Sequence, residues 1–273
     1  MNNRKLVIVR GGGDLATGSI HRLWSAGFEV LVLETEAPAA IRRQVAVCEA
    51  VYSGETQIEG MWAQKVNSID EIEKVLAEGK IPVFIDPEGK CIEHFSPKVV
   101  VDAIIAKKNL GTNKAMAPVT IALGPGFEAG VDVDYVVETK RGHDLGRIIR
   151  SGFAVKNSGI PGNIGGYTSE RVMKSPAEGR FIALKEIGDI VNSNDVIGEV
   201  IKADGSKAEV KTEIAGILRG ILKSEYEVTE GFKLADVDPR LEELKNCFTI
   251  SDKARCIAGS VLELCVKAYN EVQ

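Results

Sequence analysis

The chain opens with a short apolar strand that runs into three consecutive glycines and then into a helix. Residues 5–18 read KLVIVRGGGDLATG; the stretch from Leu6 to Val9 is typical of a buried strand, and residues 16–24 have helical spacing. Glycines at such a turn let the backbone approach a phosphate, and the free N–H groups of a helix start supply donors to it. The sequence therefore predicts a parallel α/β sheet with a phosphate cradle after its first strand.

A carboxylate stands where dinucleotide-binding folds place their contact with the ribose. The glycine pattern is Gly11-x-Gly13-x-x-Ala16, and Glu34 ends the next apolar strand, about 20 residues further on. The cofactor-binding residues predicted at this turn are Gly11, Gly12, Gly13, Asp14, Thr17 and Glu34. The alternative is a doubly wound domain whose glycine turn binds nothing.

The rest of the chain divides into three regions. Strand and helix signals alternate first, with a helix expected over 69–78 from the capping-box pair Ser68 and Glu71, and a Gly/Pro-rich segment follows. Residues 1–168 are expected to form a Rossmann-like, doubly wound parallel sheet that binds a nucleotide. Short strands at regular spacing predict a small β-rich module over 169–238. Its order of segments, GDIV, NDVIGEV, IAGILRGIL and YEVTEGFKLADVDPR, resembles the lipoyl/biotinyl-type barrel-sandwich, so that fold is expected for this module. Helices over 239–273 are expected to pack on the body.

Composition and charge narrow the class of protein. The net charge of −5 over 273 residues argues against nucleic-acid binding, and no apolar run reaches the length of a membrane span. Five scattered cysteines without a CxxC pair indicate reduced thiols and a cytoplasmic protein, and no metal site follows from the spacing of cysteine and histidine. Lys207 lacks the flanking methionines of a lipoyl or biotinyl carrier, so a covalent carrier is not expected.

Two further groups of polar residues are candidates for chemistry. Asp102 ends the strand that contains Val99 to Val101, at the edge of the sheet where open α/β folds bind ligands; it is a candidate catalytic residue, and capping of the following loop is the alternative. Arg141, His143 and Arg147 lie among glycines after another strand. The arginines are predicted to bind an anion and His143 to transfer a proton. The alternative is a surface loop in which Arg147 pairs with an acidic neighbour such as Asp144.

Several long blocks resemble a known family. VIVRGGGDLATGSIHRL, IRRQVAVCEAVYSG, VVVDAIIAKKNLGT, IALGPGFEAGVDVDYVVETKRGHDLGRII, GILRGIL and DVDPR together resemble the accessory proteins of selenium-dependent molybdenum hydroxylases, the YqeB-type family. The N-terminal region is also distantly similar to XdhC-type chaperones of the molybdenum cofactor. The resemblance implies a maturation factor with a xanthine dehydrogenase-like molybdenum hydroxylase as its client. It supplies no catalytic residue.

The sequence is therefore compatible with three functions. The first is maturation of a molybdenum hydroxylase, with a dinucleotide-like cofactor, molybdopterin cytosine dinucleotide or NAD, bound at the glycine turn. The second is an NAD-dependent oxidoreductase acting on a small anionic substrate, with His143 as its proton donor. The third is a non-catalytic scaffold that contacts the hydroxylase. Whether a reaction is catalysed and whether the chain self-associates are left open.

Overall fold

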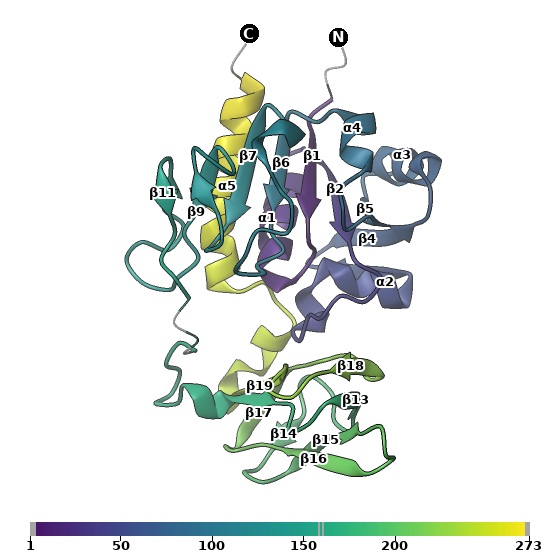
Figure 1. Cartoon of the computed structure of the whole chain (residues 1–273), viewed down its shortest axis with the longest axis vertical. Coiled ribbons are helices and arrows are strands. Elements are labelled where there is room, and N and C mark those ends of the chain that lie inside the picture. The colour runs from purple at the N-terminus through teal and green to yellow at the C-terminus, as the bar shows by residue number, and fades with distance from the viewer. Residues whose placement is uncertain (1–3, 158, 160, 271–273) are drawn as a thin grey trace. The chain divides into compact units, whose positions relative to one another are not determined.

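The computed structural model describes residues 4–157, 159 and 161–270. The chain forms two compact units, each discontinuous in sequence. The first unit contains Met1–Pro38, Ala46–Ser158 and Ile250–Gln273. The second contains Ala39–Val45 and Gly159–Thr249. Figure 1 traces both units from the N-terminus to the C-terminus.

The first unit is built on a nine-stranded mixed sheet. Its strand order is β10-β9-β7-β6-β1-β2-β5-β4-β3, with parallel neighbours from β9 to β4 and an antiparallel strand at each edge. The strands are β1 (Leu6–Arg10), β2 (Glu29–Glu34), β3 (Glu55–Ile58), β4 (Met61–Val66), β5 (Ile81–Ile85), β6 (Val99–Asp102), β7 (Val119–Leu123), β9 (Tyr135–Val137) and β10 (Ile148–Ile149). A separate two-stranded sheet pairs β8 (Glu128–Ala129) with β11 (Gly152–Phe153).

Helices cover both faces of this sheet. The helices are α1 (Asp14–Ser25), α2 (Ala50–Ser53), α3 (Ile69–Ala77), α4 (Cys91–Phe95) and α5 (Asp252–Asn270). On one face α1 and α5 pack on alternate residues of the central strands, such as Val7 and Val9, and on the other face α3 and α4 cover Leu6 and Ile8. Central strands that are buried on both faces explain the β-branched, continuously apolar runs of the sequence.

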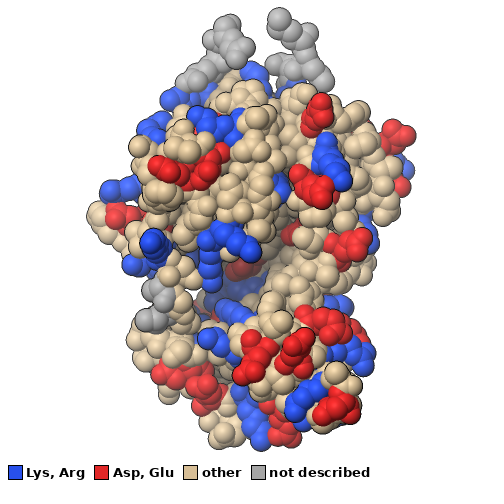
Figure 2. All heavy atoms as spheres, viewed as in Figure 1, with Lys and Arg blue, Asp and Glu red and all other residues tan. Residues whose placement is uncertain are grey.

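Short helical turns complete the secondary structure. They span Arg43–Val45, Val47–Glu49, Lys114–Met116, Ser169–Arg171 and Leu241–Cys247. On the visible face of the first unit, basic and acidic side chains are scattered among broad areas of uncharged residues (Figure 2).

The second unit consists of two four-stranded antiparallel sheets around their own apolar core. The orders are β12-β19-β17-β14 and β16-β15-β13-β18. The strands are β12 (Val172–Lys174), β13 (Gly179–Ala183), β14 (Ile190–Val191), β15 (Val196–Ile201), β16 (Lys207–Lys211), β17 (Gly216–Ile221), β18 (Tyr226–Val228) and β19 (Lys233–Asp238). Residues 39–45 belong to this unit, since the backbone carbonyl of Ile41 accepts a hydrogen bond from Ile221 N–H at 2.9 Å.

The expected Rossmann-like arrangement of the first unit is wrong. A Rossmann sheet has the strand order 3-2-1-4-5-6. Here β5, the fourth parallel strand of the chain, lies between the second, β2, and the third, β4. The connection from β6 to β7 carries only the turn Lys114–Met116 in place of a crossover helix. The unit is instead a mixed α/β structure with a large, mostly parallel sheet.

The expected lipoyl-type barrel-sandwich is corrected as well. Regular spacing of short strands predicts hairpins, and the hairpin of β15 and β16 with its turn at Asp204 and Gly205 is present. The spacing of strands along the chain does not determine how two sheets pack on each other, so it could not establish a lipoyl-type barrel-sandwich. Lys207 lies at the start of β16, where its ammonium pairs with Glu199 at 2.7 Å.

Candidate functional site at the carboxyl edge of the large sheet

The glycine turn after β1 is filled by the chain itself. Gly11 has a φ of +90°, and a Cβ atom there would lie 2.9 Å from the backbone of Ile104. A Cβ on Gly12 would lie 3.0 Å from the backbone nitrogen of Cys48. Gly13 differs, because nothing lies within 4 Å of its Cβ position. The first two glycines are therefore required by packing within the protein, and the third borders open space.

Glu34 holds the glycine turn in place. Its carboxylate is buried and accepts hydrogen bonds from Gly12 N–H at 2.6 Å and from Thr35 N–H at 2.9 Å, one to each oxygen. Burial raises the pKa of Glu34, and the two backbone hydrogen bonds lower it in part. A carboxylate that contacts a ribose and a carboxylate that stabilises the turn can lie at the same distance in sequence from the glycines. The sequence alone therefore predicted a ribose contact for Glu34.

Replacement of this carboxylate gives a test by pH. Because the pKa of Glu34 is raised in the folded protein, folding favours its protonated form, and ionisation as the pH rises lowers stability. Glu34→Gln is neutral and keeps an oxygen for Gly12 N–H. The wild type should therefore lose stability relative to the variant as the pH rises from 4.5, the ordinary pKa of a glutamate, to 7. Urea unfolding at both pH values measures this; a difference that is independent of pH would contradict it.

Thr17 is also committed to the fold. Its hydroxyl is fully buried, donates to Gly13 O at 2.9 Å and accepts from Val47 N–H at 2.9 Å. It thereby ties the first turn of α1 to the turn Val47–Glu49. Asp14 is the first residue of α1 and lies at the mouth of the glycine turn.

Asp102 organises the loop that follows β6. Its buried carboxylate accepts from the Thr112 hydroxyl at 2.5 Å and from Ile104 N–H at 3.2 Å. Burial raises the pKa of Asp102, while the hydrogen bonds and the nearby Arg10 guanidinium lower it. Arg10 itself is buried and donates to Thr112 and to Pro87 O. These partners match the capping alternative that the sequence left open.

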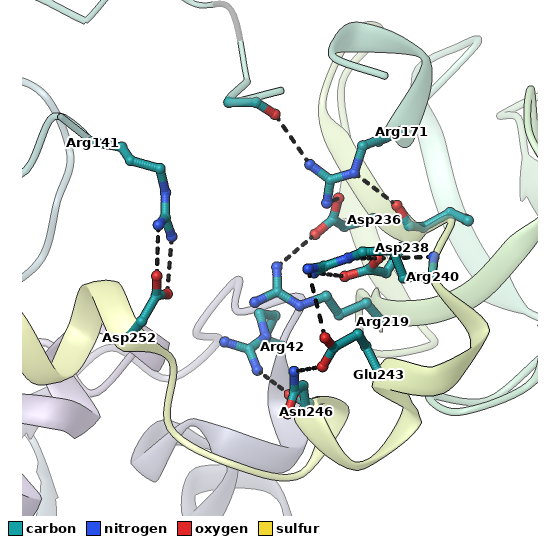
Figure 3. A network of polar contacts seen from close by, with 12 residues as sticks. Arg42, Arg141, Arg171, Arg219, Asp236, Asp238, Arg240, Glu243, Asn246 and Asp252 are labelled. Carbon is teal, nitrogen blue, oxygen red and sulfur yellow. Dashed lines mark hydrogen bonds and ion pairs between the residues drawn. The ribbon is translucent and has the colours of Figure 1, made fainter. Parts of the chain in front are cut away.

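The loop after β9 presents its basic side chains at the surface. Arg141 makes a bidentate ion pair with Asp252, with N···O distances of 2.6 and 3.0 Å (Figure 3). Arg147 pairs with Asp144 at 2.7 Å, and His143 is exposed. The structure therefore does not gather these three side chains around one buried position.

Lys253 is a residue that the sequence reading missed. It lies in the first turn of α5, is half-buried, and its side chain has no hydrogen bond or ion pair to any residue in the described part of the chain. Burial lowers its pKa, and Asp14 is the carboxylate that acts most strongly against this shift. The helical pattern of residues 252–272 was recognised, but nothing local indicates that this helix starts beside the glycine turn.

Helices α1 and α5 run parallel, so both N-termini lie at the carboxyl edge of the sheet (Figure 1). Ala254, near the start of α5, packs on Gly18 in the first half of α1. At the other end, the Tyr269 hydroxyl bonds to the carbonyl of Leu6, the first residue of β1. Two positive helix ends therefore meet close to Lys253.

An open groove lies elsewhere on the first unit. It has a volume of about 800 Å³ and includes Ile92, Met116 and Pro118 in its lining. None of the residues selected from the sequence lines it. Among the described residues, no group of three or more His, Cys, Asp or Glu side chains is arranged to hold a metal ion, and no helix is long and apolar enough to cross a membrane.

Comparison with known proteins gives one close sequence match. The chain is 46% identical over 262 residues to the uncharacterized protein YqeB of Escherichia coli K12. The match covers 96% of this chain and 47% of that protein, so the chain spans about half the length of the curated relative. No family model matches.

The solved structures with some likeness are of another kind. They include an aspartoacylase family protein from Mesorhizobium loti, with 13% identity, a TM-score of 0.27, and coverage of 81% of this chain and 60% of that one. The ectoine utilization protein EutE (DoeB) from Ruegeria pomeroyi has 10% identity, a TM-score of 0.28, and coverage of 85% and 84%. A succinylglutamate desuccinylase/aspartoacylase from Rhodobacter sphaeroides has 11% identity, a TM-score of 0.26, and coverage of 85% of both chains. At these values we derive neither fold nor activity from them.

These findings correct the resemblance drawn from the sequence. The similar curated protein is uncharacterized and no family model matches, so neither comparison points to a molybdenum hydroxylase accessory protein or to an XdhC-type chaperone. The assignment to a hydroxylase maturation family is wrong, and with it the molybdopterin dinucleotide. The NAD alternative loses its basis too, because Glu34, which carried the dinucleotide interpretation, is occupied by backbone amides.

Proposed function

We propose that the first unit binds a small molecule through a phosphate or carboxylate group at the N-termini of α1 and α5. The observation that carries the proposal is Lys253. Its side chain is half-buried beside two helix N-termini, and its ammonium has no hydrogen-bond partner among the described residues. An anion there would gain a charge-assisted hydrogen bond from Lys253 and the favourable field of both helices.

The start of α1 offers backbone donors to such a ligand. Gly13 is the N-cap residue and provides no side chain to satisfy the first N–H groups of the helix. Its Cβ position borders open space, so a ligand oxygen has room to approach. Gly11, Gly12, Glu34 and Thr17 support this arrangement indirectly, because they fix the turn from which α1 begins.

Nearby carboxylates limit the affinity that we expect. Asp252 is neutralised by its bidentate pair with Arg141. Asp14 is the acidic group that most favours the charged form of Lys253. A bound anion and the Asp14 carboxylate would compete for the Lys253 ammonium. Substitutions that remove the charge of Lys253 and of Asp14 should therefore have opposite effects on the affinity for the anion.

Removal of the ammonium should abolish most of the binding. Lys253→Met keeps most of the length of the side chain and loses the charge, and a hydrogen bond to a charged group contributes roughly 1.5–3 kcal/mol. We expect the affinity for inorganic phosphate to fall by about tenfold or more. Chemical-shift titration of the backbone amides of Gly13, Asp14 and Leu15 with phosphate measures this at the site itself.

Two further variants make the test specific. Asp14→Asn should strengthen phosphate binding, because it removes the competing carboxylate. Gly13→Ala should weaken it without loss of fold, since the new methyl group meets only the ligand. Gly259→Ala, in an equally open position of α5, is the matched control. If the wild type shows no saturable shifts at these amides, or if Lys253→Met binds equally well, the proposal is wrong.

A cytoplasmic location belongs to the same proposal. The five cysteines are free thiols, and four of them are buried. Burial raises the pKa of Cys91 and of Cys265 to about 12, which keeps both in the unreactive thiol form. Unpaired thiols of this kind are usual in reducing compartments.

A further inference from the structure

The turn between β3 and β4 has an unusual residue at its first position. Ile58 and Met61 pair across the hairpin, so the loop contains only Glu59 and Gly60, whose φ values are +47° and +86°. A two-residue loop with two positive φ values is a type I′ turn, in which asparagine, aspartate and glycine are preferred at the first position. A glutamate adopts this left-handed conformation at a cost, and such conformations persist only where the surrounding structure fixes them.

The side chain of Glu59 reaches from the hairpin to the segment that starts α5. Its Oε1 atom accepts from Ile250 N–H at 2.8 Å, and Nη2 of Arg255 donates to both carboxylate oxygens at 2.7 Å. Burial acts to raise the pKa of Glu59, but the hydrogen bonds from Arg255 and Ile250 outweigh it and lower the pKa below its ordinary value. All three residues belong to the first unit, so the carboxylate ties an early hairpin of this unit to its last helix.

These two contacts bracket the residue on which the proposed anion site depends. Lys253 lies between Ile250 and Arg255, in the first turn of α5. The backbone N–H of Arg255 donates to the carbonyl of Ser251 at 2.9 Å, which closes this turn. The side chain of Lys253 has no hydrogen bond or ion pair to any described residue, so its position follows from the backbone of the turn that Glu59 holds.

We infer that Glu59 is a positioning residue of the anion site, and that it acts on the first turn of α5 through Ile250 and Arg255. This role rests on the proposed function: Glu59 does not touch the anion, but holds the Lys253 ammonium where the anion binds. A helix end that is fixed before the ligand arrives loses less conformational freedom on binding. Without the carboxylate the first turn can open, and the anion itself would have to order Lys253.

Glu59→Asn separates this role from a role in folding. Asparagine followed by glycine is the preferred sequence of a type I′ turn, so the hairpin of β3 and β4 should be kept. The shorter, uncharged side chain loses the ion pair with Arg255. We expect the affinity for inorganic phosphate to fall about three- to tenfold. The shifts of the Gly13 and Asp14 amides measure this, while the free energy of unfolding in urea should change little because the better turn offsets the lost contacts.

A second readout follows the start of α5 without any ligand. Because the Arg255 amide donates to Ser251, its hydrogen exchange reports opening of the first turn. Glu59→Asn should speed this exchange by about threefold or more and leave that of the Leu264 amide, in the body of the helix, unchanged. Arg255→Lys keeps a positive charge for Glu59 and should retain most of the phosphate affinity, whereas Arg255→Met should lower it as Glu59→Asn does.

Glu78→Ala is the matched control, because it removes another partly exposed ion pair of the first unit, the pair with Lys80 at 2.8 Å. It should bind phosphate as the wild type does. If Lys253→Met weakens phosphate binding and Glu59→Asn does not, the positioning role is wrong and the anion site stands. If the wild type shows no saturable shifts, the anion site is wrong, and the positioning role fails with it whatever the exchange of the Arg255 amide.

Discussion

Asp236→Ala is expected to destabilise the second unit by about 3–5 kcal/mol, the usual cost of removing one partner from a buried ion pair. The Arg171 side chain is 4% exposed and that of Asp236 is 9% exposed, so the substitution leaves a guanidinium uncompensated inside the unit. It also removes the hydrogen bond that Arg219 Nη1 donates to Asp236. Hydrogen exchange of the amides that pair β17 with β19 reports the stability of this unit directly.

A matched pair shows whether burial is the cause. Arg180 and Glu225 also form an ion pair in the second unit, but their side chains are 45% and 61% exposed. Exposed ion pairs contribute about 0–1 kcal/mol to stability, so Arg180→Ala should change the hydrogen-exchange rates of these amides only slightly. The double change Arg171→Met with Asp236→Leu should recover much of the lost stability, because no charge is then left buried. Equal effects of Asp236→Ala and Arg180→Ala would contradict this interpretation.

Gly18→Val is expected to separate α1 from α5. A Cβ atom on Gly18 would lie 2.7 Å from Cβ of Ala254 and 2.8 Å from its backbone carbonyl, which is closer than packed atoms approach. Overpacking of this kind costs about 1–3 kcal/mol, and we expect the upper end because α5 is held along its length. Urea unfolding followed by the fluorescence of Trp24 measures the change in the first unit.

The control for this substitution lies on the partner helix. Gly259 of α5 has open space around its Cβ position, so Gly259→Ala should be neutral or slightly stabilising. Because Gly18 packs beside the proposed anion site, Gly18→Val should also weaken phosphate binding. A Gly18→Val protein with wild-type stability would show that the two helices are not held this closely.

Local features of the sequence predicted several elements well. Ser68 and Glu71 indicated a capping box, and α3 begins there: the Ser68 hydroxyl accepts from Glu71 N–H, and Glu71 accepts from Asn67 N–H. The stripe of Ile257, Val261 and Leu264 predicted a docking face, and all three are buried in the core of the first unit. Such features depend on neighbours within one or two helical turns, which a sequence shows directly.

Features that depend on distant pairings were not predictable. The position of β5 between β2 and β4 depends on which strands pair, and the spacing of residues along the chain does not encode it. Glu34 follows the ribose-contact spacing and binds the turn instead. Asp236 and Arg171 are separated by 65 residues, so each looked like an ordinary charged residue of a short strand. The same distance effect concealed Lys253, whose neighbour Asp14 is at the other end of the chain.

The contribution of residues 39–45 to the second unit has a consequence for biosynthesis. The carbonyl of Ile41 accepts a hydrogen bond from β17, and Arg43 donates to the carbonyl of Ile221. Residues 39–45 therefore cannot make these contacts until β17 has been synthesised. The first unit cannot complete its fold until α5 has been synthesised, because α5 covers its central sheet and follows the whole second unit in sequence. Neither unit is complete while the ribosome is still translating residues 46–220. The nascent chain is therefore expected to expose the apolar strands of both units for most of its synthesis.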